Sequence, residues 1–304
     1  MEGIEKTEFP ACYEFITVSD VVKQAINRES STAEETLKTE TSTILNSGFR
    51  DLDHIIQSFN SKQLISIAVR PGKGKTAFLL SLIHNLALTN NKRIAVFSPE
   101  RSAIKLVQRL IESETGNSAE RVYSGTYKES DKEKVDLIIS KFIQSEVIID
   151  DSTSLNITEI TNRCKYLVEE QHVDMILFDN IELYSKNILD SDINFFEQEK
   201  MMSEISLLTK SINIPILLLT HSTNINNLID INDKPTIDNV APFIKQHSDV
   251  VVFIHRPNLL NFHKPEFSEW KGCAELILIK HPEVNTPSSI KLKFIESSDR
   301  FTDF

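Results

Sequence analysis

The sequence is poor in cysteine, in basic charge and in glycine, and each shortage excludes something. Three cysteines among 304 residues are too few and too scattered for a disulfide framework or a zinc cluster. A net charge of −11 argues against a broad basic face for nucleic acid, although it leaves open a narrow basic channel built by several subunits. With 40% hydrophobic and 25% charged residues, the composition is that of an ordinary globular protein.

Long hydrophobic runs are also missing. No apolar run approaches the ~18 residues that cross a bilayer, and the first residues lack the pattern of an export signal. We therefore expect a cytoplasmic protein without membrane contact. Average glycine usage of about 7% would give roughly 21 glycines, but the chain has seven. Two of them, Gly72 and Gly74, lie within three residues, which indicates a place where the backbone must be bare.

Residues 1–43 predict an arm that precedes the core. Apolar residues at helical spacing predict a short amphipathic helix at about 17–28, and Thr17 with Asp20 resembles a capping box. Twelve of the fifteen residues 29–43 are Ser, Thr or Glu, which is typical of a solvated linker. Nothing local covers the apolar stripe of the helix. We expect it to pack on a neighbouring subunit, with folding back onto its own core as the alternative.

Residues 44–304 predict one α/β domain. Short apolar runs alternate with helical patterns, which implies a parallel sheet covered by helices on both faces. The last runs follow with less helix between them, as expected if the sheet ends in antiparallel strands. The predicted strands are Leu64–Val69, Ile94–Phe97, Val147–Ile149, Met175–Phe178, Ile216–Leu219, Val250–Ile254 and Leu276–Ile279. The predicted helices are Thr76–Leu88, Ala103–Ser113, Ile157–Glu170 and Lys200–Ile212.

A glycine-bearing loop follows the first of these strands. Its residues are Arg70, Pro71, Gly72, Lys73, Gly74, Lys75, Thr76 and Ala77. Between a strand and a helix, such a loop binds a triphosphate with its backbone N–H groups. Lys75 would reach the β- and γ-phosphates, and Thr76 would place its hydroxyl on Mg²⁺. The motif has its first glycine where Val69 stands, which constrains the turn. We predict ATP and Mg²⁺ as cofactors.

Two carboxylates end neighbouring apolar runs, where parallel sheets collect their ligands. We expect Asp179 to order Mg²⁺ and Glu100 to activate water, as phosphoryl transfer requires. Polar residues are common at strand exits, so it is the phosphate loop that favours this interpretation. Asp150 and Asp151 also follow a strand, and we interpret them as a loop or a helix cap.

With these residues in place, the chain resembles the C-terminal, RecA-like motor domain of the DnaB replicative helicase family. The similarity covers nearly all of residues 44–304. The matching segments are Ser47–Asp53, Arg70–Phe78, Phe97–Glu100, Leu106–Leu110, Ile149–Asp151, Ile176–Asp179 and Asn213–Ile216. The resemblance implies a RecA-like P-loop NTPase with Glu100 as catalytic base. It also implies a ring-type homo-oligomer, expected to be a hexamer, single-stranded DNA as substrate, and other replication proteins as partners. The family's separate N-terminal domain has no counterpart in these residues.

Departures from the family pattern bear on mechanism. His221 stands at the γ-phosphate sensor position, where the family has glutamine. A histidine there can still donate a hydrogen bond to the phosphate; the alternative is a histidine that only packs at the end of a strand. The family's trans lysine and arginine finger correspond to Lys280 and Pro282. A trans arginine is worth about 10³–10⁵ in turnover, so its loss predicts slow hydrolysis unless Lys280, His281 or Arg256 substitutes. The alternative for Lys280 is a solvated lysine at a strand end.

The candidate pore segments give weak support for tight DNA binding. Ser185–Phe196 and Ser222–Gln246 hold three lysines, Lys186, Lys234 and Lys245, among five aspartates. Phosphate neutralisation by basic groups normally dominates the affinity for single strands.

We therefore predict an ATP-hydrolysing, DnaB-like helicase motor acting on single-stranded DNA in replication. The first alternative is a catalytically weakened relative that binds ATP and regulates or assembles with a replicative helicase. A RecA-like signalling or recombination ATPase is a less favoured third hypothesis.

Overall fold

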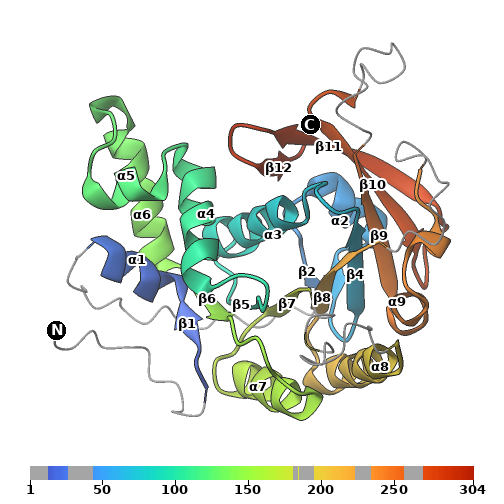
Figure 1. The fold of residues 1–304 in the computed structure, drawn as a ribbon. Helices are drawn as coiled ribbons and strands as arrows, with labels where there is room; N and C mark the ends of the chain where they lie inside the picture. Colours follow the sequence, from blue (N-terminus) through green and yellow to red (C-terminus); the bar gives the residue numbers. More distant parts are fainter. Residues whose placement is uncertain (1–12, 27–43, 181–183, 185–194, 223–233, 257–269) are drawn as a thin grey trace.

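A mixed ten-stranded sheet forms the centre of the molecule (Figure 1). The computed structural model describes residues 13–26, 44–180, 184, 195–222, 234–256 and 270–304. In spatial order the strands are β1 (Ile16–Thr17), β6 (Val147–Asp150), β5 (Ile94–Phe97), β7 (Met175–Asp179), β8 (Ile216–His221), β4 (Leu64–Val69), β9 (Val250–His255), β10 (Cys273–Lys280), β11 (Ser288–Ile295) and β12 (Arg300–Thr302). A separate two-stranded sheet joins β2 (Ile44–Leu45) to β3 (Phe59–Asn60).

The predicted parallel centre and antiparallel end of the sheet are both confirmed. Strands β6, β5, β7, β8, β4 and β9 run parallel, so their carboxyl ends share one edge. Strands β10, β11 and β12 continue the sheet in antiparallel fashion. Each strand predicted from an apolar run is present, and several of them extend beyond the predicted ends.

Helices cover both faces of the sheet (Figure 1). One face carries α1 (Val18–Ile26), α3 (Lys75–Ile83), α4 (Ala103–Thr115), α5 (Ala119–Ser124) and α6 (Lys132–Gln144), and the other carries α7 (Ile157–Glu169), α8 (Phe195–Ile212) and α9 (Pro242–His247). The remaining helix, α2 (Arg50–Ile56), precedes β3. The side chains of β4 alternate between the two cores: Ile65, Ile67 and Val69 face one, and Leu64 and Ala68 the other. A strand buried on both faces must be apolar throughout, which explains its sequence.

One helix prediction needs correction, and four of the described helices were not predicted. The helix predicted at 76–88 is not one regular α-helix, because α3 ends at Ile83 and a π-helical turn continues from His84 to Thr89. Helices α2, α5, α6 and α9 were not predicted. Each of α2, α5 and α9 has only six or seven residues, too few for a clear hydrophobic period.

The N-terminal helix packs on its own chain. Its buried residues Val18, Val21 and Val22 contact α6 and α4, and β1 before it pairs with β6 at the edge of the sheet. The expected cap is present, since the Asp20 N–H donates to Thr17 Oγ1 at 3.0 Å. The alternative of folding back therefore describes this structure, and the apolar stripe is not left open for a neighbour. The predicted linker, residues 29–43, lies outside the described residues.

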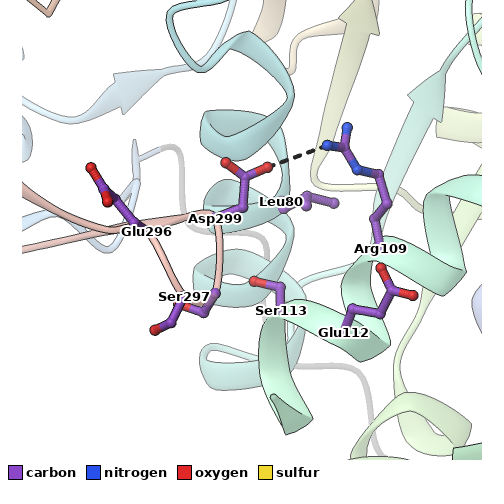
Figure 2. Close-up of a pocket in the computed structure, with 8 residues that line it drawn as sticks. Leu80, Arg109, Glu112, Ser113, Glu296, Ser297 and Asp299 are labelled. Atoms are coloured by element: carbon purple, nitrogen blue, oxygen red, sulfur yellow. Dashed lines mark hydrogen bonds and ion pairs between the residues drawn. The ribbon is translucent and has the colours of Figure 1, made fainter. Parts of the chain in front are cut away.

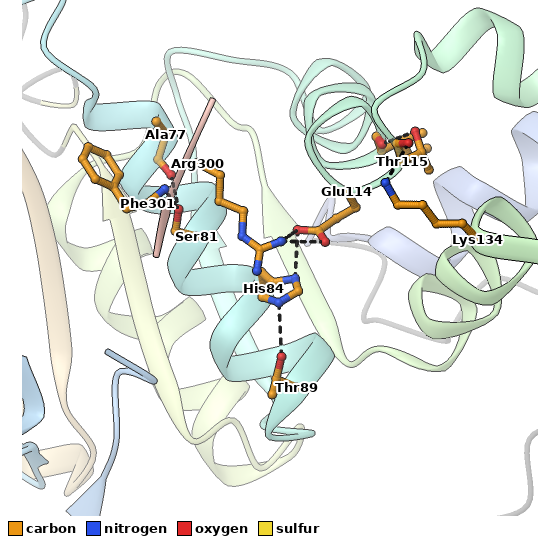
Figure 3. A network of polar contacts seen from close by, with 10 residues as sticks. Ala77, Ser81, His84, Thr89, Glu114, Thr115, Lys134, Arg300 and Phe301 are labelled. Atoms are coloured by element: carbon orange, nitrogen blue, oxygen red, sulfur yellow. Dashed lines mark hydrogen bonds and ion pairs between the residues drawn. The ribbon is translucent and has the colours of Figure 1, made fainter. Parts of the chain in front are cut away.

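Polar contacts fix the C-terminal strand onto α3 and α4 (Figure 3). The Phe301 N–H donates to Ser81 Oγ at 2.9 Å, and the same hydroxyl donates to the Ala77 carbonyl at 2.8 Å. Glu114 on α4 accepts from Arg300 and also pairs with His84 Nδ1 at 2.8 Å. These contacts hold β12 beside the first turns of the helix that follows the glycine loop. In the described part of the chain, none of the helices is both long and apolar enough to cross a bilayer.

Packing of α1 on its own chain makes a stability prediction. Val22→Ala removes two carbons from a fully buried site, which we expect to lower the free energy of unfolding by about 2 kcal/mol. Gln24→Ala, on the exposed side of α1, should change it by less than about 0.5 kcal/mol. Urea unfolding at several protein concentrations measures both. A loss of stability in Val22→Ala that vanishes at the lowest protein concentration would show instead that the helix packs on a second copy.

Candidate functional site

The glycine loop leaves β4 at the shared carboxyl edge and turns into α3. Val69, in place of the motif's first glycine, is fully buried as the last residue of β4. Gly74 caps α3 with φ +108°, a value that favours glycine, and a Cβ there would lie 3.0 Å from the ring of Phe301. Both the conformation and the space therefore require glycine at Gly74. The exposed Gly72 also has positive φ but open space around it.

Lys75 joins the loop to both predicted carboxylates. Its Nζ lies 2.8 Å from Glu100 Oε2 and 2.7 Å from Asp179 Oδ1. The lysine side chain is 7% exposed and the Asp179 side chain 0%, while Glu100 is 35% exposed and so stays open to water. The structure thus brings together residues from three strand ends, β4, β5 and β7. This is the grouping that the sequence predicted.

Electrostatics keep Glu100 ionised. Burial raises the pKa of its carboxyl, but the hydrogen bond and positive charge of Lys75 oppose this effect. The charges of Arg101 and His221 add to the opposition, and the pKa ends below its usual value. Lys75 therefore favours the charged form of this carboxyl group in the nucleotide-free site.

His221 lies at the tip of β8, paired in register with Val69. It stands between the loop strand and β7, and its charge acts on Glu100. The structure thus places His221 at the same edge of the sheet as the glycine loop and Glu100. Arg101, which sequence reasoning missed, lies 4.0 Å from Glu100 Oε1. Its only signal in the sequence was its place directly after Glu100.

The donor set around Asp179 fits Mg²⁺. Asp179 Oδ2 is buried and has no hydrogen-bond partner among the described residues, and Thr76 is the second residue of α3, directly after Lys75. Mg²⁺ prefers such oxygen donors and is usually held by one or two carboxylates together with phosphates and water. No group of three or more His, Cys, Asp or Glu side chains within the described ranges could hold a metal alone. A metal here would therefore bind together with the nucleotide.

Lys280 lies far from the glycine loop of its own chain. It pairs with Val251, at the opposite end of β9 from the edge that carries Gly74. Its ammonium donates to the carbonyls of Lys245 and Ser248 at 2.8 and 2.5 Å, which closes the C-terminal end of α9. Lys280 is thus partly exposed at a strand end, hydrogen-bonded to two carbonyls and away from its own chain's glycine loop, so a role at a phosphate site would be at that of a neighbouring copy.

His281 and Arg256, the other two candidates to replace the arginine finger, lie in different surroundings. His281 is held at both ring nitrogens, since Nδ1 accepts from the Glu283 and Val284 N–H groups and Nε2 lies 3.2 Å from the Ile56 carbonyl. Arg256 lies beside the loop, 6% exposed, with its guanidinium 3.6 Å from the centre of the Phe294 ring. Arg256 therefore remains a cation at the site of its own chain.

The other two acidic residues considered in the sequence, Asp150 and Asp151, form contacts that stabilise the fold. Asp151 Oδ2 accepts from the Ala103 N–H at 2.8 Å, which caps α4 as interpreted. Asp150 ends β6 and forms a buried ion pair of 2.6 Å with Arg163. Of the pore lysines, Lys234 pairs with Glu275 and Lys245 with Asp238. Lys186 and most of the two candidate pore segments lie outside the described residues.

A small polar pocket of about 170 Å³ lies elsewhere, between α3, α4 and the turn before β12 (Figure 2). It is lined by Leu80, Arg109, Glu112, Ser113, Glu296, Ser297, Ser298 and Asp299. Arg109 closes one side through its contact of 3.4 Å with Asp299. None of the predicted site residues lines this pocket.

The fold and the site define a RecA-like P-loop domain: a mixed sheet with helices on both faces, a glycine loop before a helix, and two acids from adjoining strands. Comparison with known proteins narrows the class. Residues 45–303 match the model of the DnaB-like helicase C-terminal domain, and the chain belongs to this family.

Individual relatives agree with the family. A replicative DNA helicase DnaB of Geobacillus stearothermophilus is 27% identical over 84% of this chain and 56% of its own length. A probable replicative DNA helicase of Trieres chinensis is 31% identical over 86% of this chain and 57% of its own length. The chain thus spans a little over half of these proteins. A solved DnaB-like replicative helicase has a TM-score of 0.73 at 19% identity, with 87% of this chain and 63% of that chain covered, which shows the shared fold.

Removal of Lys75 should raise the pKa of Glu100. Without the lysine, the effect of burial is opposed only by Arg101 and His221, so in Lys75→Met we expect the pKa to move upward. Carboxyl-carbon NMR titration of the nucleotide-free protein measures it. Lys73→Met, which alters the same loop, should leave the pKa of Glu100 in place. An unchanged pKa in Lys75→Met would show that the lysine does not hold the carboxylate in solution.

Proposed function

We propose that the chain binds and hydrolyses ATP as the motor domain of a DnaB-type replicative helicase, acting on single-stranded DNA as a ring-type homo-oligomer, expected to be a hexamer. The observation that carries the proposal is the convergence of Lys75, Glu100 and Asp179 at one edge of the sheet. A protein that only packs a glycine turn needs no lysine buried between two acids. The cost of burying such charges is offset only when a paired or bound partner is present.

Each residue has a role that follows from its place. The backbone of residues 70–77 and the start of α3 would hold the phosphates of ATP, with Gly74 allowing close approach. Lys75 would leave its two carboxylates and move to the β- and γ-phosphates. Thr76 and Asp179 would then hold Mg²⁺, which supplies positive charge to the transferring phosphoryl group.

Water activation falls to Glu100. Its ionised, partly exposed carboxylate can orient a water and accept its proton, while His221 would donate a hydrogen bond toward the γ-phosphate. The family's finger position holds Pro282 in this chain, so no arginine from that position can stabilise the transition state. Lys280 of a neighbouring copy and Arg256 of the same chain are the cations left for this task, and slow turnover is expected.

Steady-state hydrolysis with and without single-stranded DNA tests the proposal. Glu100→Gln should lower kcat by about 10²–10⁴ and leave nucleotide affinity nearly unchanged, because the amide cannot accept the proton. Lys75→Ala should weaken nucleotide binding itself. Glu133→Gln, an exposed glutamate on α6, is the matched control and should hydrolyse ATP like the parent. Size measurement with and without ATP tests the ring.

One observation favours a second candidate function, a weakened relative that binds ATP and regulates or assembles with a true replicative helicase. Proline occupies the finger position, and Lys280 already caps α9. In that case the protein would retain nucleotide without turnover, and Glu100→Gln would change nothing. A helicase partner, rather than DNA, would then alter its nucleotide exchange.

A further inference from the structure

The C-terminal hairpin, β10 and β11, and the two described residues shortly before it carry a group of exposed basic side chains and one indole. Lys291 and Lys293 are exposed residues of β11 that lie two positions apart, so both point to the same side about 6.5 Å from each other. Lys271 is exposed just before β10. Trp270, the only tryptophan in the sequence, lies with its ring 4.5 Å from Lys291 Nζ. We call Trp270, Lys271, Lys291 and Lys293 the hairpin patch.

Local charge at the hairpin patch is opposite to that of the whole chain. The protein has a net charge of −11, yet the two hairpin strands hold one acidic residue, Glu275. Its side chain is 5% exposed and its Oε1 already accepts from Lys234 at 2.7 Å and Ser289 at 2.8 Å. Glu275 therefore neutralises Lys234 and leaves the lysines of the patch to attract an anion.

The lysines of the hairpin patch could protect an open sheet edge from pairing with another chain, but this role does not explain Trp270. β12 pairs with residues 293–295 of β11, so among the described residues the outer edge of Ser288–Leu292 carries no further strand. Lysines on such an edge discourage pairing with another chain. That role does not need a half-buried indole under the ammonium of Lys291. An aromatic ring beside a row of lysines is the combination by which proteins bind single-stranded nucleic acid: the ring stacks a base and the lysines neutralise phosphates.

The hairpin patch also adjoins the segment that the sequence assigned to the pore. Lys234 is the first described residue after 223–233, and its ammonium reaches Glu275 in the middle of β10. Glu275 is paired in register with Lys291, so Lys234, Glu275 and Lys291 lie on one face of the sheet. A nucleic-acid strand in contact with Lys234 would therefore have Lys291 on the same face of the sheet. The patch thus supplies basic charge that the pore segments themselves have in short supply.

We propose that the hairpin patch binds single-stranded nucleic acid, with a base stacked on Trp270 and the phosphates on Lys291, Lys293 and Lys271. The incoming base takes the place of the Lys291 ammonium over the indole, and the ammonium moves to the adjoining phosphate. The inference rests on the proposed action on single-stranded DNA, but it names a surface outside the nucleotide site and outside the two pore segments.

Tryptophan fluorescence of the full chain is the direct test. We expect titration with an oligothymidylate to quench the emission of Trp270, because a base stacked on this ring contacts the only indole in the sequence. The titration is done with and without a non-hydrolysable ATP analogue. In parallel, anisotropy of a labelled oligothymidylate gives the affinity. Trp270→Ala should weaken binding about 5- to 150-fold, the range seen when one stacking aromatic is removed.

Charge variants test the lysines by salt dependence. Lys291→Gln/Lys293→Gln should weaken binding and flatten the slope of log K against log salt by about 1.4, since each phosphate contact on a single strand contributes about 0.7. Lys291→Arg/Lys293→Arg keeps the charges and should keep the affinity. The matched control Lys132→Gln/Lys141→Gln removes two lysines from α6, at the other end of the sheet (Figure 1), and should leave the slope unchanged. Thermal unfolding confirms that each variant is folded.

Three outcomes would overturn the proposal. One is no quenching of Trp270 on oligonucleotide binding, and another is a parental affinity and slope in the double glutamine variant. The third is displacement of the oligonucleotide by polyglutamate at equal charge concentration, which would show a docking site for an acidic protein. Nucleotide affinity and DNA-independent hydrolysis, measured in the same variants, should match the parent protein. If the parent protein itself neither binds nor hydrolyses the nucleotide, that result would count against the proposed function and not against the hairpin patch.

Discussion

The ion pairs of Lys75 with Glu100 and Asp179 are the interaction on which the site depends. They bring together the ends of three parallel strands, and they put a cation where, under the proposed function, phosphate and metal would meet the same side chains. Because Asp179 is fully buried, its charge is tolerable only with such a partner. The buried carboxylate is thus paired from within the chain, and under the proposed function ATP and Mg²⁺ would take over this role when Lys75 moves to the phosphates.

Sheet topology is what makes this contact possible. Residues 75, 100 and 179 are far apart along the chain, and only the parallel order of β5, β7, β8 and β4 places them at one edge. The strands beyond β9 differ, since they continue the sheet in antiparallel fashion. They put Lys280 at the opposite end from the loop of its own chain. One chain therefore presents a complete phosphate loop at one end of β9 and a candidate contribution to a neighbour at the other.

Much of this arrangement could be predicted from the sequence, and the parts that could not share a physical cause. Fully apolar runs such as Leu64–Val69 identify buried parallel strands, and Asp151 at a strand exit does cap a helix. Three other features join residues that are far apart in the sequence. Helix α1 packs on α4 and α6 of its own chain, Lys280 donates to carbonyls at the end of α9, and Phe301 lies beside Gly74. A local pattern shows that Val22 needs cover, but not which helix provides it. For Lys280, charge alone could not distinguish a carbonyl partner from a phosphate.

The seating of Phe301 against Gly74 has a consequence for synthesis of the protein. The Phe301 N–H bonds to Ser81, 220 positions earlier, so the aromatic ring beside the glycine loop is made long after the loop itself. On the ribosome, the loop and α3 emerge long before β12 can dock. Until then the flank of Gly74 is open to solvent, and the loop lacks the ring that limits the space beside it. Completion of the site therefore waits for the translation of β12.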